Sequence, residues 1–215
     1  MSSIRDVLKQ SSRNAQLEEF LRTNLAEAGY GGSDVSKTPM GSSLTLFVTR
    51  PGMVIGRRGV GIRALTEEIQ EKFNLNNLQI SLLEVEVPEL HPLVMANRIA
   101  HTVSRGTAFR RSAVWAMNLI MNAGASGAEI GIAGKLRSDR ANHEKFRAGV
   151  VPKSGEFATN VVRSDIADVL LKTGLFGIKV SIALPGSVAP EVELLGTDDD
   201  KTEGTEKELM DNATS

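Results

Sequence analysis

The sequence predicts an α+β protein with two small mixed domains and an acidic tail. Three observations support this prediction: amphipathic helical segments alternate with short strands, Pro88 and Pro92 separate two such sets, and acidic residues dominate after residue 187. The chain has 215 residues, of which 41% are hydrophobic and 24% are charged. This length and composition allow each domain to bury a core of its own.

Hydrophobic periodicity defines the elements of the first half. Residues 17–28 and 60–73 carry apolar side chains every three or four positions, which predicts two amphipathic helices. Residues 43–50 and 78–87 alternate between apolar and polar side chains and predict strands. The alternation of the second strand restarts at Leu83, which predicts a bulge or a strong twist. Residues 1–16 are polar, and we expect them to be flexible.

The second half predicts two helices, over residues 93–105 and 108–122, separated by Gly106. Strands are expected over residues 129–135 and 178–184, whereas residues 160–172 fit either a helix or a strand. Between them, residues 134–155 are basic and rich in turn-forming residues. Pro88 and Pro92 separate the two halves, and we expect the acidic tail over residues 187–215 to be disordered.

Positive charge is concentrated in the second half of the folded part. The formal net charge of the whole chain is −1, but residues 187–215 hold nine acidic residues and two lysines. Residues 98–185 hold thirteen basic and six acidic residues. Such a cationic region indicates a polyanionic partner, although a solvated basic face without a ligand is the alternative.

A glycine-bracketed turn, Gly56-Arg57-Arg58-Gly59, precedes the helix expected over residues 60–73. The glycines permit a tight turn without bulky side chains, so a polynucleotide backbone can approach it. The first amide groups of the following helix favour phosphate, and Arg57 and Arg58 add charge there. K-homology domains clamp about four nucleotides of single-stranded nucleic acid in this way. A surface turn with two solvated arginines is the alternative.

Two further groups of basic residues predict phosphate contacts. Arg110 and Arg111 lie in the first turn of an expected helix and oppose its dipole, a conflict that bound phosphate would resolve. The basic stretch adds Lys135, Arg137, Arg140, Lys145, Arg147 and Lys153, which suit several phosphate contacts rather than one small-molecule substrate. Solvated turns and loops are the alternatives for both groups. Because aromatic residues make up only 4% of the chain, we expect binding by charge rather than by ring stacking.

The sequence offers little for catalysis, metal binding or membrane insertion. The absence of Cys excludes disulfides and thiol nucleophiles and fits a reducing compartment. His91, His101 and His143 lack metal-ligand spacing, and the glycine turn lacks the Gly-Lys-Ser/Thr ending of a P-loop. No apolar run approaches about 18 residues, and the N-terminus lacks a signal core. We expect no enzyme activity, no cofactor, no membrane partner and a cytoplasmic location.

Several longer segments resemble a known family. They are residues 29–32, 37–41, 50–59 (RPGMVIGRRG), 71–75, 121–130 (MNAGASGAEI) and 177–180. Together they are similar to universal ribosomal protein three of the small subunit, in its archaeal form, over about residues 15–185. The resemblance implies a type-two K-homology domain over residues 17–87, with a three-stranded sheet and helices on one face of it. A smaller α+β domain over residues 93–185 follows.

The resemblance also implies partners and sites. Members of the family are structural components of the subunit head that bind its ribosomal RNA, contact neighbouring ribosomal proteins and line the channel through which messenger RNA enters. The resemblance puts Gly56, Arg57, Arg58 and Gly59 against nucleic acid, and Arg110 and Arg111 where messenger RNA enters. Bacterial relatives have a third basic residue where this chain has Val114. That role is therefore weaker here, or it is taken over by Arg105 or by the stretch over residues 135–153.

Two other functions remain open at this point. The same domain occurs in RNA-binding adaptors or maturation factors that act off the ribosome. A nuclease is the second alternative, although the sequence shows no paired carboxylates or histidine cluster. The acidic tail lies outside the resemblance; it mimics a polyanion, docks a basic neighbour or merely keeps the chain in solution.

Overall fold

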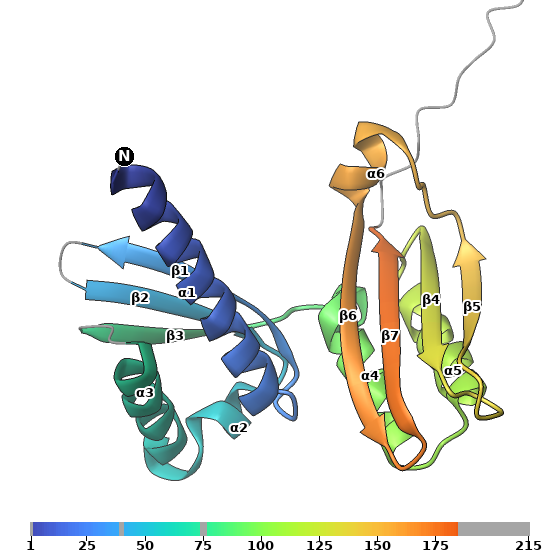
Figure 1. Ribbon diagram of the computed structural model, residues 1–215, viewed down its shortest axis with the longest axis horizontal. Coiled ribbons are helices and arrows are strands. Elements are labelled where there is room, and N and C mark those ends of the chain that lie inside the picture. The colour runs from blue at the N-terminus through green and yellow to red at the C-terminus, as the bar shows by residue number, and fades with distance from the viewer. Residues whose placement is uncertain (1, 39–40, 74–76, 185–215) are drawn as a thin grey trace, which may run out of the picture.

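The structure is a computed structural model that describes residues 2–38, 41–73 and 77–184. The described part forms two mixed domains that lie side by side and are joined through the 3₁₀ turn η2 (Pro88–Leu90) (Figure 1). The tail expected over residues 187–215 lies outside the described residues.

The N-terminal domain is a three-stranded sheet with helices on one face, as the resemblance implied. Its elements are α1 (Ser2–Asn24), β1 (Tyr30–Thr38), β2 (Gly41–Val48), α2 (Pro51–Ile55), η1 (Arg57–Gly59), α3 (Val60–Phe73) and β3 (Leu78–Glu84). The strand order is β1-β2-β3, in which β2 pairs antiparallel with β1 and parallel with β3. The predicted helix over residues 60–73 has the bounds of α3.

The core of this domain lies between the sheet and the helices α1 and α3. Alternate residues of β2, Leu44, Leu46 and Val48, are fully buried because they all point to the helix-covered face. Leu17 and Leu21 of α1 and Leu65 and Ile69 of α3 meet them at helical spacing. This packing fixes the position of the turn between α2 and α3.

The structure corrects three expectations in the first half. We expected residues 1–16 to be flexible and a helix to cover residues 17–28, but helix α1 begins at Ser2 and ends at Asn24. Strand β1 was not expected, because its polar, glycine-containing sequence gains order from pairing with β2. Strand β3 has no bulge: its pairing with β2 is continuous, Leu83 faces away from the core, and the strand ends at Glu84.

The C-terminal domain is a four-stranded antiparallel sheet with two helices on one face. Its elements are α4 (Pro92–Ser104), α5 (Phe109–Asn122), β4 (Gly127–Gly134), β5 (Asn142–Gly149), α6 (Gly155–Val161), β6 (Val162–Leu171) and β7 (Gly174–Ala183), and the strand order is β5-β4-β7-β6. In Figure 1 the helices α4 and α5 lie behind the sheet, and the other face of the sheet is turned toward the viewer.

The core of the second domain joins isoleucines of β4 and β7 to small residues of the helices. Ile130 and Ile178 are fully buried against Ala96, Ala113 and Ala116. The small side chains let both helices pack closely on the sheet, so their remaining residues form an outer face that carries polar and charged groups. The interface described below depends on that division.

In the second half, one expectation is corrected and one open alternative is decided. The basic stretch over residues 134–155 is not mainly turns, because it contains strand β5, which pairs with β4 over its whole length. The segment over residues 160–172, which fitted a helix or a strand, is the end of α6 followed by β6. Pairing with β7, which residue preferences alone do not reveal, decides that segment.

Contacts between the domains start at the first turn of α4. Leu93 belongs to α4 but is buried in the core of the N-terminal domain. Arg22 of α1 lies 3.4 Å from a carboxylate oxygen of Asp165 on β6. Burial lowers the pKa of the His91 imidazole and raises the pKa of the Asp165 carboxyl. Among the residues that the structure describes, an apolar anchor, Leu93, and one ion pair, between Arg22 and Asp165, connect the two domains.

Leu93→Ala should destabilise the N-terminal domain although Leu93 lies on a helix of the other one. Because Leu93 is only 3% exposed, the truncation should lower the free energy of unfolding by about 2–5 kcal/mol. Urea denaturation followed by circular dichroism measures the change. The control is Leu170→Ala, at a side chain that is 79% exposed, which should change the free energy by less than about 0.5 kcal/mol. Equal effects of the two variants would contradict the anchoring role of Leu93.

Candidate nucleic-acid interface

The glycine-bracketed turn lies at the junction of α2 and α3. Gly56 and Gly59 have φ angles of +66° and +76°, in the left-handed region that glycine adopts without strain. A Cβ atom on Gly61 would lie 2.6 Å from the carbonyl oxygen of Val54, so glycine at this position lets the two helices approach each other. A Cβ atom on Gly59 would meet nothing within 4 Å, so the outside of the turn is open.

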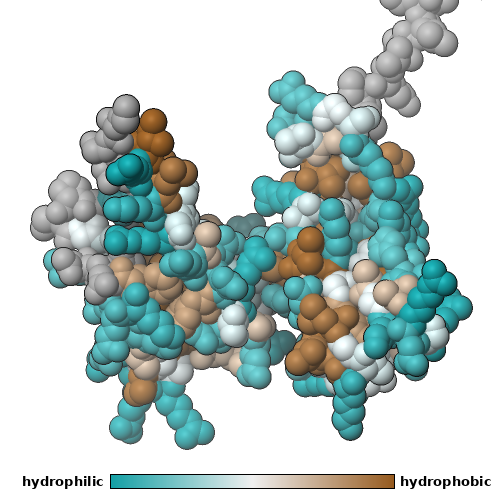
Figure 2. Space-filling view, viewed as in Figure 1, coloured by the Kyte–Doolittle hydropathy of each residue, from teal (hydrophilic) through white to brown (hydrophobic). Residues whose placement is uncertain are grey.

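Arg57 and Arg58 are both exposed on this turn. Arg58 itself has a φ of 54° and a ψ of 25°, a left-handed conformation that residues other than glycine rarely adopt. The surrounding turn holds Arg58 in this conformation. Figure 2 shows hydrophilic side chains projecting from the end of the domain where α2 meets α3. Among the described residues, neither arginine has an ion-pair partner, so both are available to an anion.

Sequence reasoning missed two more exposed cations beside the turn. Arg50 immediately precedes α2, and Arg63 lies in the first turn of α3. Within the part of the chain that the structure describes, neither forms a salt bridge. The signal in the sequence that could have identified them is their place at the start of the two helices: Arg50 directly precedes α2, and Arg63 lies in the first turn of α3.

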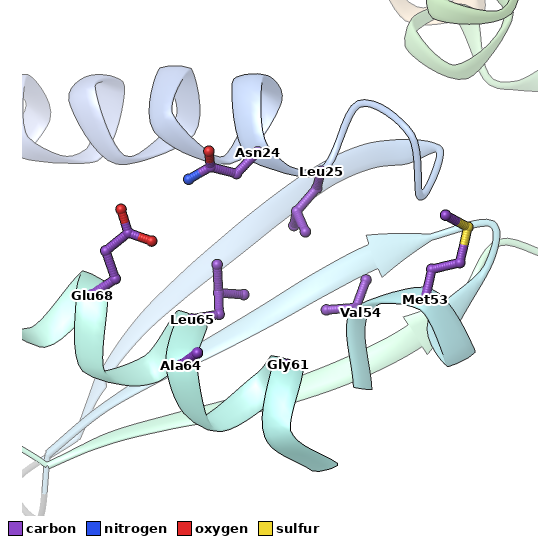
Figure 3. A pocket seen from close by; sticks show the side chains of 8 residues that line it. All are labelled: Asn24, Leu25, Met53, Val54, Gly61, Ala64, Leu65 and Glu68. Atoms are coloured by element: carbon purple, nitrogen blue, oxygen red, sulfur yellow. The ribbon is translucent and has the colours of Figure 1, made fainter. Parts of the chain in front are cut away.

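A shallow groove runs beside the same helices, between the end of α1 and the α2–α3 pair (Figure 3). Its walls are mostly apolar, with Leu25, Met53, Val54 and Leu65, and Glu68 supplies the one charged side chain among the residues that line it. A carboxylate and no cation make this groove unsuitable for a phosphate chain. The cationic turn is therefore distinct from this groove.

Within the part of the chain that the structure describes, the two arginines of the predicted pair differ: Arg110 binds a carboxylate, and Arg111 does not. Arg110 donates two hydrogen bonds to Glu144 of β5, with distances of 2.8 Å from Nε and 2.9 Å from Nη2, and Arg137 donates a third at 2.8 Å. Glu144 therefore partly relieves the conflict between Arg110 and the helix dipole without any bound phosphate. Arg111 is exposed and has no ion pair among the described residues.

A second carboxylate binds two more of the predicted cations. Glu129 of β4 lies directly opposite Arg147 of β5 and accepts a hydrogen bond of 2.8 Å from its Nε, and Lys153 lies 2.9 Å away. The hydrogen bond from Lys153 is the main cause that lowers the pKa of the Glu129 carboxyl, and Arg147 adds to it. Glu129 is therefore ionised at neutral pH and neutralises part of this charge.

The predicted cations therefore do not form one continuous site. Lys145 and Arg147 alternate along β5 with Phe146, which packs against the core on the helix side, so the two cations lie on the open face of the sheet. Arg137 and Arg110 meet on the helix side. Over residues 2–38, 41–73 and 77–184, the predicted cations without an ion pair are Arg57, Arg58, Arg105, Arg111, Lys135, Arg140 and Lys145.

The described residues contain no group of three or more His, Cys, Asp or Glu side chains placed to hold a metal ion. A search of the same residues finds no helix with the length and apolar character needed to cross a membrane. The exposed features that could bind a ligand are positive charges, glycine turns and the N-terminal ends of helices.

Comparisons with known proteins agree with this arrangement. Residues 16–90 match the family model described as "KH domain", and residues 99–182 match "Ribosomal protein S3, C-terminal domain". The small ribosomal subunit protein uS3 of Methanothermobacter thermautotrophicus is 44% identical over 187 residues, which cover 87% of this chain and 72% of that protein. The chain belongs to the uS3 family.

Other uS3 proteins support the assignment to the archaeal form of the family. The protein of Thermofilum pendens is 41% identical over 195 residues, which cover 91% of this chain and 96% of that protein. The protein of Haloarcula marismortui is 38% identical over 191 residues, covering 89% of this chain and 63% of that protein. The resemblance and the two-domain fold expected for the uS3 family are thus confirmed, whereas the residue roles that it implies stay predictions.

Glu144→Gln should strengthen RNA binding, because it releases Arg110 and Arg137 from an internal carboxylate. The two released arginines can make up to two further phosphate contacts. Each contact makes the slope of log K against log[salt] steeper by about 0.7 for a single strand. Fluorescence anisotropy of labelled single-stranded RNA at several salt concentrations measures it.

Glu156→Gln is the matched control, since it removes the same charge from an exposed residue of α6 that has no ion pair among the described residues. It should leave the salt slope nearly unchanged. If both variants gave the same increase, net charge alone would account for the effect, and the release of Arg110 and Arg137 would be rejected.

Proposed function

We propose that the chain is a structural constituent of the small ribosomal subunit and binds the ribosomal RNA of that subunit. Family membership carries this proposal, since the uS3 relatives are named as proteins of the small subunit and match most of the chain. The exposed cations described above provide the means of binding. They replace the counterions of the RNA backbone, so binding is driven by ion release and falls with salt.

The two domains would contribute in different ways. In the N-terminal domain, the open turn with Arg57 and Arg58 and the first amides of α3 would contact the backbone of a single strand. In the C-terminal domain, Arg111 and Arg105 would contact phosphates beside the α4–α5 connection. Arg110 would do so only in competition with Glu144, which already binds its guanidinium.

Messenger RNA is the finer proposal. Arg110 and Arg111 would line the channel through which messenger RNA enters. Because Val114 is not basic, Arg105, Lys135 and Arg140 would take over part of that contact. Neighbouring proteins of the subunit head would cover other parts of the surface. This role requires no catalytic chemistry, and we place the chain in the cytoplasm as part of the ribosome.

Replacing Arg57 and Arg58 by Asp should weaken binding of single-stranded RNA by at least about tenfold, because four units of charge change beside the phosphates. Anisotropy titration with a labelled oligonucleotide measures the affinity, and far-ultraviolet circular dichroism should stay native because both side chains are exposed. The comparison variant is Arg57→Gln with Arg58→Gln. It removes the two positive charges without adding negative ones, so it should give an intermediate loss of affinity. Undiminished binding by the Asp variant would remove the turn from the interface.

Sedimentation tests the ribosomal role itself. The epitope-tagged chain, expressed in an archaeal host, should co-sediment with small subunits in a sucrose gradient and stay bound after a high-salt wash, since an assembled constituent is held by many contacts at once. An RNA-binding adaptor would instead dissociate in that wash. Recovery of the chain only at the top of the gradient would contradict the proposal.

A further inference from the structure

The chain's single tryptophan lies on the surface of the C-terminal domain. Trp115 of α5 is 41% exposed, and the guanidinium of Arg98 on the neighbouring helix α4 lies 5.0 Å from the centre of its ring. Arg98 is in turn 3.5 Å from Glu89. The indole is thus held from one side by a cation that is itself anchored, and much of the ring still faces solvent.

Trp115 belongs to a row of polar side chains along the outer face of α5. Arg111, Asn118 and Asn122 lie four residues before it and three and seven residues after it, so all four share one side of the helix. All four are exposed, whereas Ala113, Ala116 and Ile120 on the opposite side are buried against the sheet. The row offers a cation, an aromatic ring and two amides.

The adjacent face of α4 adds two arginines, one of which, Arg98, is paired with Glu89. Arg98 and Arg105 are seven residues apart, two helical turns, and both are exposed. The sequence contains no Asp or Glu from residue 90 to residue 128. The outer face of the α4–α5 pair therefore carries arginines, an aromatic ring and amides but no carboxylate of its own.

We propose that this face binds one unpaired nucleotide of single-stranded RNA, whose base stacks on the indole of Trp115. Arg111, one turn away, would meet a flanking phosphate, and Asn118 would hydrogen-bond an edge of the base. The inference rests on the proposed function, because it specifies how the α4–α5 side of the interface contacts RNA. It departs from the expectation, drawn from an aromatic content of 4%, that ring stacking plays no part.

Charge is the reason to favour RNA over a protein partner. A protein surface covering an exposed tryptophan needs apolar area, and beside Trp115 the exposed neighbours on the same row are an arginine and two amides. An RNA strand uses all of these groups, because it presents a stacking base and phosphates at one step of the chain. The carboxylate recorded beside this face, Glu89, is paired with Arg98, which balances its charge toward an approaching phosphate.

The single tryptophan makes the proposal directly measurable, because all indole fluorescence of the full-length chain comes from Trp115. The chain is titrated with a short oligouridine RNA and with an abasic RNA of the same length, which has the same phosphates but no bases. Oligouridine should quench the fluorescence strongly, and the abasic strand should leave it nearly unchanged. Anisotropy of labelled oligouridine gives the affinity of each variant.

Trp115→Leu should weaken oligouridine binding about tenfold, whereas Trp115→Phe, which keeps a ring, should retain most of the affinity. Val114→Ala is the matched control, since Val114 is the neighbouring side chain and is 50% exposed; its affinity should equal that of the unmodified chain. Thermal unfolding of each variant confirms that it folds.

The outcomes separate this inference from the proposed function. If oligouridine binds without quenching and Trp115→Leu binds as well as the unmodified chain, the stacking site is overturned while RNA binding stands. Equal quenching by the abasic strand also overturns stacking. Failure of every RNA to bind overturns the proposed function together with the inference.

Discussion

Uneven distribution of carboxylates is the physical constraint on which the rest of this structure depends. The second domain places Arg98, Arg105, Arg110 and Arg111 in a stretch of sequence that holds no acidic residue. Just beyond that stretch, Glu129 and Glu144 each bind two cations. The fold thus neutralises some of its positive charge internally and leaves the rest exposed, which favours a polyanion over any neutral partner.

Packing explains why the arginines of α4 and α5 lie on the outer face of that helix pair. Small residues of α4 and α5 bury the inner faces of both helices against the isoleucines of the sheet, so arginines have room only on the outer face. In the first domain, close approach of α2 and α3 at Gly61 holds the cationic turn outward. The anchor Leu93 joins the two units, so that both cationic regions belong to one connected body.

Sequence periodicity predicted most of the elements but not their partners. Helix α3 and strand β7 follow from apolar spacing alone, whereas β1 and β5 exist because of pairing with β2 and β4, which the local sequence does not encode. The cations at candidate sites could be named from the sequence because charge is visible there. The sequence does not reveal which of these cations are bound by Glu129 or Glu144, because those contacts join residues that strand register brings together. The exposure of Trp115 depends likewise on the packing of α4 against α5.

Counting the ions released on RNA binding tests the central claim most directly. The affinity of the full-length chain for single-stranded RNA is measured over a range of potassium chloride concentrations, and log K is plotted against log[salt]. If at least four of the unpaired cations contact phosphates, the slope should be about −3 or steeper. A slope near zero, with binding intact, would show that RNA is held by something other than the exposed positive charge.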